Sequence, residues 1–391
     1  MNRNNGYPIG KLRSGNQILK EHLVYMPSNL VGNRTAIFAQ AGFGKSNLVR
    51  VLLWQMMNED HFGKLVFDQR GEYAKDTQDE SGNFIPGLYH HPDVKDNLVL
   101  FTSKKKFLSN NLIEVKSIGF DLKDISVVDL LFIYPHFTDA QRELLYFYED
   151  DNSFYKKVLR QKDGSWDESN WQKDFVDWLS TSSKSGYTPL RSIRKKLTGV
   201  TKRSFFSDKS VLSELLSFLK EGKMVIVDLS GLGELDQMFV SSIICRALFI
   251  NNMYNFELEK SNEMISTVVF FEEAQNLLSP SKAQEGSIFV RLAKEGRALL
   301  LGVCAITQQP SAIDRQLLSQ FNTFVALHLE FMDDIEYLKR VAGNFAGLEQ
   351  DLRRKIPGNA YLVTRDKPFA IPLRVEHFTE EFINNQEVRK S

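Results

Sequence analysis

The stretch Ala39-Gln40-Ala41-Gly42-Phe43-Gly44-Lys45-Ser46 follows an apolar run at residues 35–38 and leads into a helical pattern at residues 47–54. Glycines in such a loop let successive backbone N–H groups curl around phosphate oxygens, and the helix dipole adds to the attraction. The lysine reaches the β and γ phosphates, and the serine hydroxyl ligates Mg2+. The flanking strand and helix disfavour a chance match in a surface turn. The residues expected to contact a nucleoside triphosphate are Ala41, Gly42, Phe43, Gly44, Lys45, Ser46 and Asn47.

Length and charge limit the class of protein. The chain has 391 residues, enough for one large α/β domain or for a domain with a sizeable insertion. Lysine plus arginine number 49 and aspartate plus glutamate also number 49, so no net charge draws the whole chain to nucleic acid or to an anionic membrane. Any contact with DNA is therefore expected from a local basic patch.

The cysteines and the apolar runs indicate the compartment. Cys245 and Cys304 both lie in apolar runs, which is typical of small core residues, with a disulfide or a catalytic thiol as the less favoured alternative. No apolar stretch reaches the roughly 18 residues of a membrane span, and residues 1–5 lack the apolar segment of a signal peptide. We therefore expect a cytoplasmic protein.

Apolar β-type runs recur between helical segments, which predicts an α/β fold with a mostly parallel sheet. Strands are expected at residues 35–38, 63–68, 223–230, 267–275, 300–309, 323–329 and 358–364. Helical periodicity at residues 138–148 and 210–219, in a region rich in charge, predicts a mainly helical insertion. The expected organisation is an N-terminal extension (1–30), a phosphate-loop core (31–102 and 221–378), the insertion (103–220) and a C-terminal tail (379–391).

Two adjacent carboxylates end the strand expected at residues 267–275. ATPases of this kind place one acid near Mg2+ and another near the attacking water at such a strand end. We expect Glu272 to serve the metal together with Ser46, and Glu273 to activate the water. Aspartate is usual in the first position, so both direct and water-mediated Mg2+ contacts stay open for Glu272. A strand end with two solvated acids is the disfavoured alternative.

A glutamine and an arginine complete the predicted site. Gln308 lies at the end of the strand expected at residues 300–309, where it is placed to hydrogen-bond the γ phosphate or its water. Arg297 follows a glycine just before this strand, and its guanidinium is expected to neutralise transition-state charge in its own subunit or across an interface. Arg291 is a second candidate for this role. Solvated arginines and a strand-end amide remain the alternatives.

In their order along the chain these segments resemble the HerA family, the bacterial and archaeal DNA-translocating ATPases of the HerA/FtsK group. The resemblance covers residues 20–100 and 220–378. It rests on the phosphate loop, Asp68-Gln69-Arg70-Gly71-Glu72-Tyr73, Ile226 to Ser230, Glu272 to Gln275, Glu295-Gly296-Arg297, Thr307 to Ser311, residues 318–323, and residues 356–362 with Arg374 and Val375.

Three positions depart from the family pattern: Ala39 replaces glycine, Glu272 replaces aspartate, and Gln275 replaces histidine. Family members also carry a small β-barrel ahead of the core. Residues 1–30 are short for such a barrel, and residues 6–10 are the candidate remnant. If the barrel docks a nuclease or other effector in the family, this chain is expected either to dock its partner by another surface or to lack one.

The resemblance implies a P-loop NTPase core of the RecA-like (ASCE) type with ATP and Mg2+ as cofactors. It also implies a homohexameric ring that threads double-stranded DNA and moves it by ATP hydrolysis. By carry-over, Lys45 and Ser46 bind the nucleotide and Mg2+, Glu273 activates water, Arg297 is the arginine finger, and Gln308 is the sensor. The family acts with a partner effector, a nuclease or a sirtuin-like NAD-consuming enzyme, and the short extension and diverged motifs favour an antiphage setting.

Several alternatives stay open. One is a nucleotide-binding ring that assembles and activates an effector with little translocation, another is a DNA-end-processing motor in repair, and a third is a conjugation or packaging motor. The last is disfavoured because the sequence has no membrane segment. ATP is preferred because no Asn-Lys-x-Asp guanine-reading motif follows a strand. The basic clusters at residues 104–106 and 194–196 are candidate DNA contacts, with a solvated surface as the alternative.

Overall fold

The computed structural model describes residues 6–79, 82–104, 112–133, 136–147, 192–193, 195–196, 202–207 and 209–390. They belong to two compact units. The first unit comprises Met1–Ser117, Glu214–Leu232 and Leu248–Ser391, and the second comprises Ile118–Ser213 and Gly233–Ala247.

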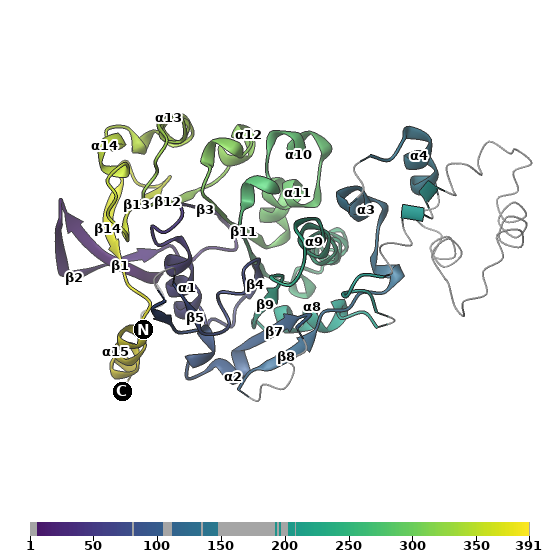
Figure 1. The fold of residues 1–391 in the computed structure, drawn as a ribbon, viewed down its shortest axis with the longest axis horizontal. Helices are drawn as coiled ribbons and strands as arrows, with labels where there is room; N and C mark the ends of the chain where they lie inside the picture. Colours follow the sequence, from purple (N-terminus) through teal and green to yellow (C-terminus); the bar gives the residue numbers. More distant parts are fainter. Residues whose placement is uncertain are drawn as a thin grey trace, which may run out of the picture. The chain divides into compact units, whose positions relative to one another are not determined.

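A sheet of twelve described strands organises the first unit. Its order is β2-β1-β14-β13-β12-β3-β11-β10-β4-β9-β7-β8, which runs broadly from left to right in Figure 1. In this order, every neighbouring pair from β12 to β8 is parallel. Every neighbouring pair from β2 to β12 is antiparallel. The bounds are β1 Tyr7–Ser14, β2 Gln17–Met26, β3 Arg34–Phe38, β4 Gly63–Asp68, β7 Leu98–Thr102, β8 Glu114–Ser117, β9 Met224–Asp228, β10 Thr267–Phe271, β11 Leu301–Thr307, β12 Thr323–Ala326, β13 Asn359–Thr364 and β14 Ile371–Val375.

The register of the parallel strands decides where the polar residues meet. Phe38, the last residue of β3, pairs with Thr307, the last residue of β11. The last residues of β4 and β9, Asp68 and Asp228, are also paired. Because parallel strands in this register end at the same edge, the loops that follow them lie along one edge of the sheet. The sheet thus gathers residues that are far apart in the sequence.

Helices cover both faces of this sheet. Successive side chains of a strand point to opposite faces, so a strand whose residues are all buried must be covered on both sides. On one face, Phe270 of β10 lies in the same apolar cluster as Leu48 and Leu52 of α1 (Lys45–Gln55). On the other face, Phe271 meets Phe289 of α11 (Ile288–Glu295) edge to face, with ring centroids 5.4 Å apart. The remaining α-helices of the described residues are α2 Val94–Asn97, α3 Val127–Ile133, α4 Asp139–Phe147, α8 Leu212–Lys220, α9 Glu234–Glu257, α10 Pro280–Glu285, α12 Arg315–Leu318, α13 Met332–Val341, α14 Glu349–Leu352 and α15 Glu380–Lys390.

The second unit has its own buried polar centre. Asp129, on α3, is fully buried and accepts hydrogen bonds from the Ser242 hydroxyl at 2.6 Å and from Arg246 Nε at 2.8 Å. A buried carboxylate requires such partners, because an unpaired one costs several kcal/mol. The charge of Asp129 is therefore compensated within the unit.

The predicted fold class, α/β with a mostly parallel sheet, is confirmed. Each strand expected from the sequence is present, and most are shorter, as for the run at 267–275, where β10 ends at Phe271. The hairpin of β1 and β2 was not predicted. Much of the expected insertion at residues 103–220 lies outside the described residues, so its structure and the domain boundaries stay predictions.

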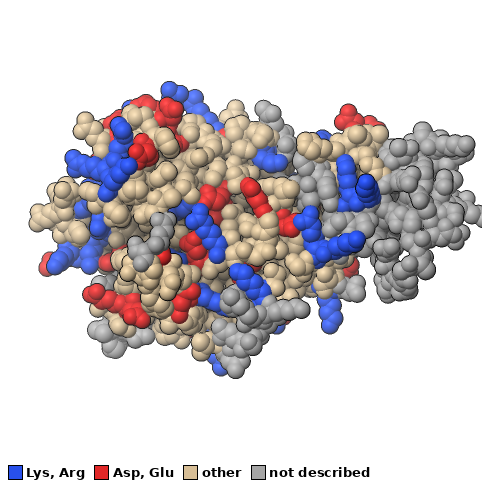
Figure 2. Space-filling view, in the orientation of Figure 1, with Lys and Arg blue, Asp and Glu red and all other residues tan. Residues whose placement is uncertain are grey.

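Both cysteines are buried and unpaired, as expected. Burial raises the pKa of the Cys245 and Cys304 thiols, which keeps them protonated and unreactive. Within the described part of the chain, no helix is both long and apolar enough to cross a bilayer. On the face shown in Figure 2, Lys and Arg side chains lie among Asp and Glu side chains, in line with the zero net charge.

Candidate functional site

The loop between β3 and α1 has the backbone that phosphate binding requires. Gly42 and Gly44 have φ angles of 77° and 98°, a left-handed region that costs other residues about 1–2 kcal/mol. A Cβ on Gly42 would meet nothing within 4 Å, so the requirement for glycine there is conformational. Ala39 is not among the residues with positive φ. The replacement of the usual glycine by Ala39 therefore introduces no backbone strain in this loop.

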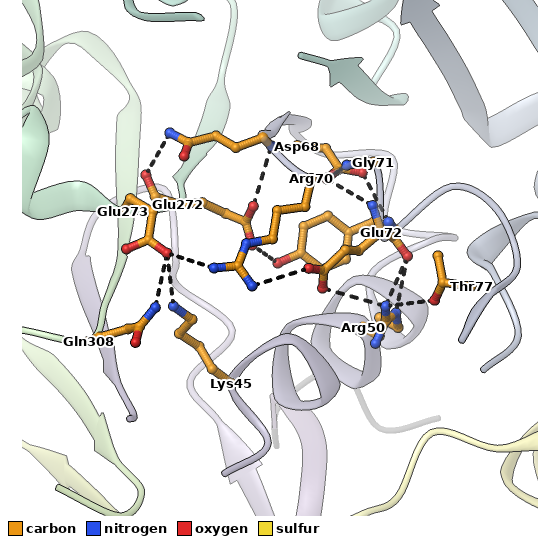
Figure 3. Close-up of polar contacts among 12 residues, drawn as sticks. Lys45, Arg50, Asp68, Arg70, Gly71, Glu72, Thr77, Glu272, Glu273 and Gln308 are labelled. Carbon is orange, nitrogen blue, oxygen red and sulfur yellow. Dashed lines mark hydrogen bonds and ion pairs between the residues drawn. The ribbon is translucent and has the colours of Figure 1, made fainter. Parts of the chain in front are cut away.

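Glu273 contacts two other residues of the predicted site, Lys45 and Gln308 (Figure 3). Its Oε1 lies 3.5 Å from Lys45 Nζ and accepts a hydrogen bond from Gln308 Nε2 at 3.2 Å. Arg70 Nη2 lies 3.6 Å from the same oxygen. The other carboxylate oxygen, Oε2, accepts from Gln275 Nε2 at 2.8 Å. The structure thus brings Lys45, Glu273 and Gln308 together from three separate segments.

The backbone of Glu273 is itself unusual. Its φ and ψ are 44° and 45°, in the left-handed region that residues other than glycine rarely adopt. Strain of this kind costs on the order of 1–3 kcal/mol and persists where the surroundings fix the residue. Here the contacts of the carboxylate fix it, and the turn directs the side chain towards the phosphate loop (Figure 3).

Electrostatics favour the anionic form of Glu273. Burial by itself raises the pKa of this carboxyl group. The hydrogen bond from Gln275, the charge of Lys45, the hydrogen bond from Gln308 and the charge of Arg70 together outweigh burial and hold the pKa below its ordinary value. A deprotonated carboxylate is the form that a general base needs.

Glu272 is in a different environment from its neighbour. It is buried, accepts a hydrogen bond from the Tyr73 hydroxyl, and accepts another from the Gln69 backbone N–H at 3.3 Å. Burial and the negative charge of Asp68 raise the pKa of Glu272 to about 8. The positive charge of Lys45 only partly offsets this rise. A buried carboxyl group beside a second acid fits a site for Mg2+, which prefers oxygen ligands and would favour the ionised form. Ser46, the other predicted ligand, lies in the first turn of α1.

The raised pKa of Glu272 has a consequence for stability in the absence of nucleotide and metal. The folded chain holds the proton more tightly than the unfolded chain, whose ordinary pKa is 4.5. Stability is therefore expected to fall, on the order of a few kcal/mol, as pH rises from about 4.5 towards 8. Urea unfolding at several pH values should show this slope, and Glu272→Gln should reduce it, leaving the part below about pH 6 that comes from Asp68, whose pKa burial raises to about 6.

The control for this measurement is Glu21→Gln, which alters an exposed carboxylate on β2. It should leave the slope as in the wild type. If Glu272→Gln has the same pH dependence as the wild type, Glu272 is not the group that titrates.

The loop after β4 is fixed by hydrogen bonds at both ends. Asp68 accepts from the backbone N–H groups of Gly71 at 2.7 Å, Glu72 at 3.0 Å and Tyr73 at 3.0 Å. Arg50 of α1 donates to the Glu72 carbonyl from Nε at 3.2 Å and from Nη2 at 3.0 Å. Gly71 has a φ of 72°, and a Cβ there would lie 2.7 Å from an oxygen of a neighbouring side chain, so glycine is required. The loop is rigidly joined to the helix that carries Lys45.

Arg297 lies away from this cluster. It is exposed in the short 3-10 helix η7 (Gly296–Leu299), which precedes β11, whereas Gln308 follows β11. The seven residues of β11 place roughly 20 Å between the two. Burial and the positive charges of Arg297 and Arg365 lower the pKa of Arg34 at the same edge. Arg291 is held on its own helix by Glu295, with Nη2 3.1 Å from Oε2.

Two residues predicted to contact the nucleotide, Asn47 and Phe43, use their side chains for contacts within the protein. The Asn47 amide donates to the Glu376 carbonyl at 2.8 Å and accepts from the Phe378 N–H at 2.8 Å. The Phe43 ring packs against the His328 ring, with centroids 4.0 Å apart. Any contact of these two with a nucleotide is therefore expected from their backbone N–H groups.

The basic clusters expected to meet DNA are only partly described. Residues 105, 106 and 194 lie outside the described residues. Lys104 Nζ lies 3.6 Å from Asp228 Oδ2 and donates to the Ser230 hydroxyl. Lys196 Nζ donates to the His136 carbonyl at 3.0 Å. Both lysines have intramolecular partners, which weakens the expectation that they bind phosphates of DNA.

Sequence reasoning missed Arg70 and the residues that fix its loop. Arg70 was part of the motif Asp68 to Tyr73, which served only to support the family resemblance. A signal was present, since a cation two residues after a strand end lies at the ligand edge of a parallel sheet.

Comparison with known families matches residues 7–248 to the helicase HerA central domain. The chain belongs to the HerA family. This confirms the resemblance drawn from the motifs. Among curated HerA proteins, the DNA double-strand break repair helicase HerA of Sulfurisphaera tokodaii is 25% identical over 339 residues, which are 86% of this chain and 63% of the relative. The protein of the same name from Saccharolobus solfataricus is 23% identical over 387 residues, 96% of this chain and 70% of the relative. The chain thus spans about two thirds of the length of these HerA relatives.

Solved structures support the P-loop NTPase fold of this HerA-family chain. The plasmid coupling protein TrwB in complex with ADP and Mg2+ has a TM-score of 0.59 and 14% identity, and the match covers 91% of this chain and 89% of TrwB. VirB4 of Thermoanaerobacter pseudethanolicus has a TM-score of 0.57 and 12% identity, with 97% and 98% covered. At such low identity the likeness concerns the fold alone.

Proposed function

We propose that this HerA-family chain hydrolyses ATP and uses the energy to move double-stranded DNA through a homohexameric ring. The observation that carries the proposal is the convergence of Lys45, Gln308 and Arg70 on one oxygen of Glu273, beside a phosphate loop with left-handed Gly42. In an ATPase motor, the residues that bind the γ phosphate, detect it and activate the attacking water all lie around that phosphate. The relatives that carry the name HerA are helicases, which agrees with this activity.

In the proposed site, the loop N–H groups and Lys45 bind the triphosphate, while Ser46 and Glu272 are the residues that would hold Mg2+. Bound Mg2+ would neutralise phosphate charge and orient the β and γ phosphates. Glu273 accepts a proton from the attacking water, and Gln308 positions that water or the γ phosphate. TrwB, which shares the fold, has been solved with ADP and Mg2+, which supports this choice of cofactors.

The ring is proposed because Arg297 lies too far from the site of its own chain. With β11 between Arg297 and Gln308, a guanidinium at the opposite strand end is expected to serve the site of a neighbouring copy. Hydrolysis would then depend on assembly, and a closed ring gives each copy one donor and one acceptor face.

For the biological setting, we propose a cytoplasmic complex with an effector protein, a nuclease or a sirtuin-like NAD-consuming enzyme, in antiphage defence. The divergence of Glu272 and Gln275 from the family pattern supports a specialised role. A motor for DNA-end processing is the alternative within the family, in line with the relatives named as DNA double-strand break repair helicases.

One observation favours a second candidate function, a nucleotide-binding ring that mainly assembles and activates its effector. Glu272 is buried, accepts from Tyr73 and has a raised pKa, which makes it a weaker metal ligand than an ionised aspartate. Slow hydrolysis with stable nucleotide binding would follow from a weakly held metal.

The deciding test is steady-state ATP hydrolysis by the purified chain with and without long linear duplex DNA, with light scattering to record assembly. A translocating motor is expected to show hydrolysis that rises several-fold with DNA and disappears in Lys45→Ala. A ring that assembles but hydrolyses no faster than Lys45→Ala under either condition would support the scaffold and reject the motor for this chain alone.

A further inference from the structure

Arg70 has no role in the proposal above beyond its contact with Glu273, yet its position is well defined. It follows β4 by two residues, and its Nη2 lies 3.6 Å from Glu273 Oε1. Its Nη1 lies 3.8 Å from Glu72 Oε1. The side chain is 59% exposed, so the guanidinium is open to a ligand as well as to these carboxylates. Figure 3 shows it extending across the site towards Lys45.

The backbone that carries Arg70 is rigid, which distinguishes it from an ordinary surface arginine. The three N–H bonds to Asp68 fix the turn on one side. The Tyr73 hydroxyl bonds Glu272, and Arg50 holds the Glu72 carbonyl. A guanidinium on a fixed loop loses less entropy when it binds an anion.

The charge balance at Glu273 points to the anion. Two cations, Lys45 and Arg70, and the amide donor of Gln308 approach one carboxylate oxygen, and Lys45 belongs to the phosphate loop. A terminal phosphate carries more negative charge and more acceptor oxygens than a carboxylate. In the chain without nucleotide, Glu273 therefore satisfies donors that a γ phosphate would satisfy better.

We propose that Arg70 is a ligand of the nucleotide γ phosphate, supplied by the same subunit that carries the phosphate loop. This rests on the proposed function, because it assigns a further residue to the same nucleotide site. When the triphosphate binds, Lys45 and Arg70 transfer from Glu273 to phosphate oxygens. The Glu273 carboxylate is then free of its cationic partners and can accept the proton of the attacking water.

This role differs from that of Arg297, since Arg70 already lies in the site of its own chain. Its contribution depends on the γ phosphate and therefore distinguishes a triphosphate from a diphosphate. Assembly is not needed for this contact, so it can be measured in binding experiments with or without a ring.

The test is calorimetric binding of ADP and of a non-hydrolysable ATP analogue, each with Mg2+, to the wild type, Arg70→Ala and Arg70→Lys. Arg70→Ala is expected to weaken the affinity for the analogue on the order of tenfold or more, while the affinity for ADP changes little. Arg70→Lys should recover part of the loss, because it keeps the charge but not the bidentate fork.

The matched control is Arg354→Ala. Arg354 is 54% exposed and pairs with Asp351 at 3.1 Å, so it resembles Arg70 in exposure and pairing but belongs to a different part of the unit. It should bind both nucleotides as the wild type does. Thermal unfolding of each variant establishes that the chains compared are folded.

The outcomes separate the two proposals. If the wild type binds both nucleotides and Arg70→Ala weakens neither, or weakens both equally, Arg70 does not contact the γ phosphate and the proposed function stands. If the wild type binds neither nucleotide, the nucleotide site itself is wrong, and the role of Arg70 is rejected with it.

Discussion

Replacing Glu273 with glutamine is expected to lower kcat for ATP hydrolysis by about 10²–10⁴-fold, the usual contribution of a general base. The amide keeps the size of the side chain but cannot accept a proton from water. Binding of ATP should survive and become tighter, because the neutral amide no longer competes with phosphate for Lys45, whose Nζ lies 3.5 Å from Glu273 Oε1. Steady-state hydrolysis together with calorimetric ATP binding measures both effects.

The matched control is Glu349→Gln. Glu349 Oε1 lies 2.6 Å from Lys339 Nζ, so this substitution also removes a carboxylate from a lysine pair, outside the site. It should alter neither hydrolysis nor binding. Turnover by Glu273→Gln close to that of the wild type would exclude Glu273 as the base, whatever its effect on affinity.

Arg297→Ala is expected to reduce hydrolysis on the order of 10³-fold, as for the loss of an arginine finger in related reactions. Because this residue lies at the far end of β11 from Gln308, the defect should be repaired by another copy. Mixing Arg297→Ala with Glu273→Gln should restore part of the activity, since an interface then forms in which one copy supplies the arginine and the other supplies the base.

The comparison variant for this experiment is Arg291→Ala. Arg291 is held by Glu295 on α11 and is expected to matter much less. Two results would count against the shared site: Arg297→Ala with wild-type turnover, or a mixture that assembles without regaining any activity. The second result would place the contribution of Arg297 outside an interface with Glu273.

The phosphate loop and the strand ends were predictable because each is a local pattern. A fully buried strand is a short apolar run, and a polar residue directly after it lies at the edge of the sheet. This is why Glu273 and Gln308 were correctly expected near Lys45, although each belongs to a different strand-loop segment.

The hairpin β1–β2 gave no comparable signal. Most residues of β2 are exposed or half-buried, so the alternation of apolar and polar residues that marks a strand is missing. β1 carries Pro8 and Gly10, which usually argue against a strand. Gly10 fits because a Cβ there would lie 2.3 Å from the Arg374 carbonyl oxygen of β14. The pairing with a strand more than 350 residues away decides the structure.

The position of Arg70 also depends on long-range contacts. Its loop curls because Asp68 accepts three backbone bonds, and its guanidinium finds Glu273 about 200 positions later in the chain. For Arg297 the sequence predicted a role but not the site in which the residue acts. The sequence identified the residue but left its own site and a neighbouring site open, and its place at the amino end of β11 is the basis for proposing the neighbouring site.

The hydrogen bonds of Asn47 have a practical consequence for shortened or tagged forms of the protein. The first turn of α1 is attached to Glu376 and Phe378, more than 300 positions along the chain, and the Glu376 N–H in turn donates to the Ile9 carbonyl at 3.0 Å. Removing the residues from 376 onwards would release the start of α1 without deleting any residue of the phosphate loop. Loss of nucleotide affinity in such a truncated form would therefore report a broken attachment and not a missing binding residue.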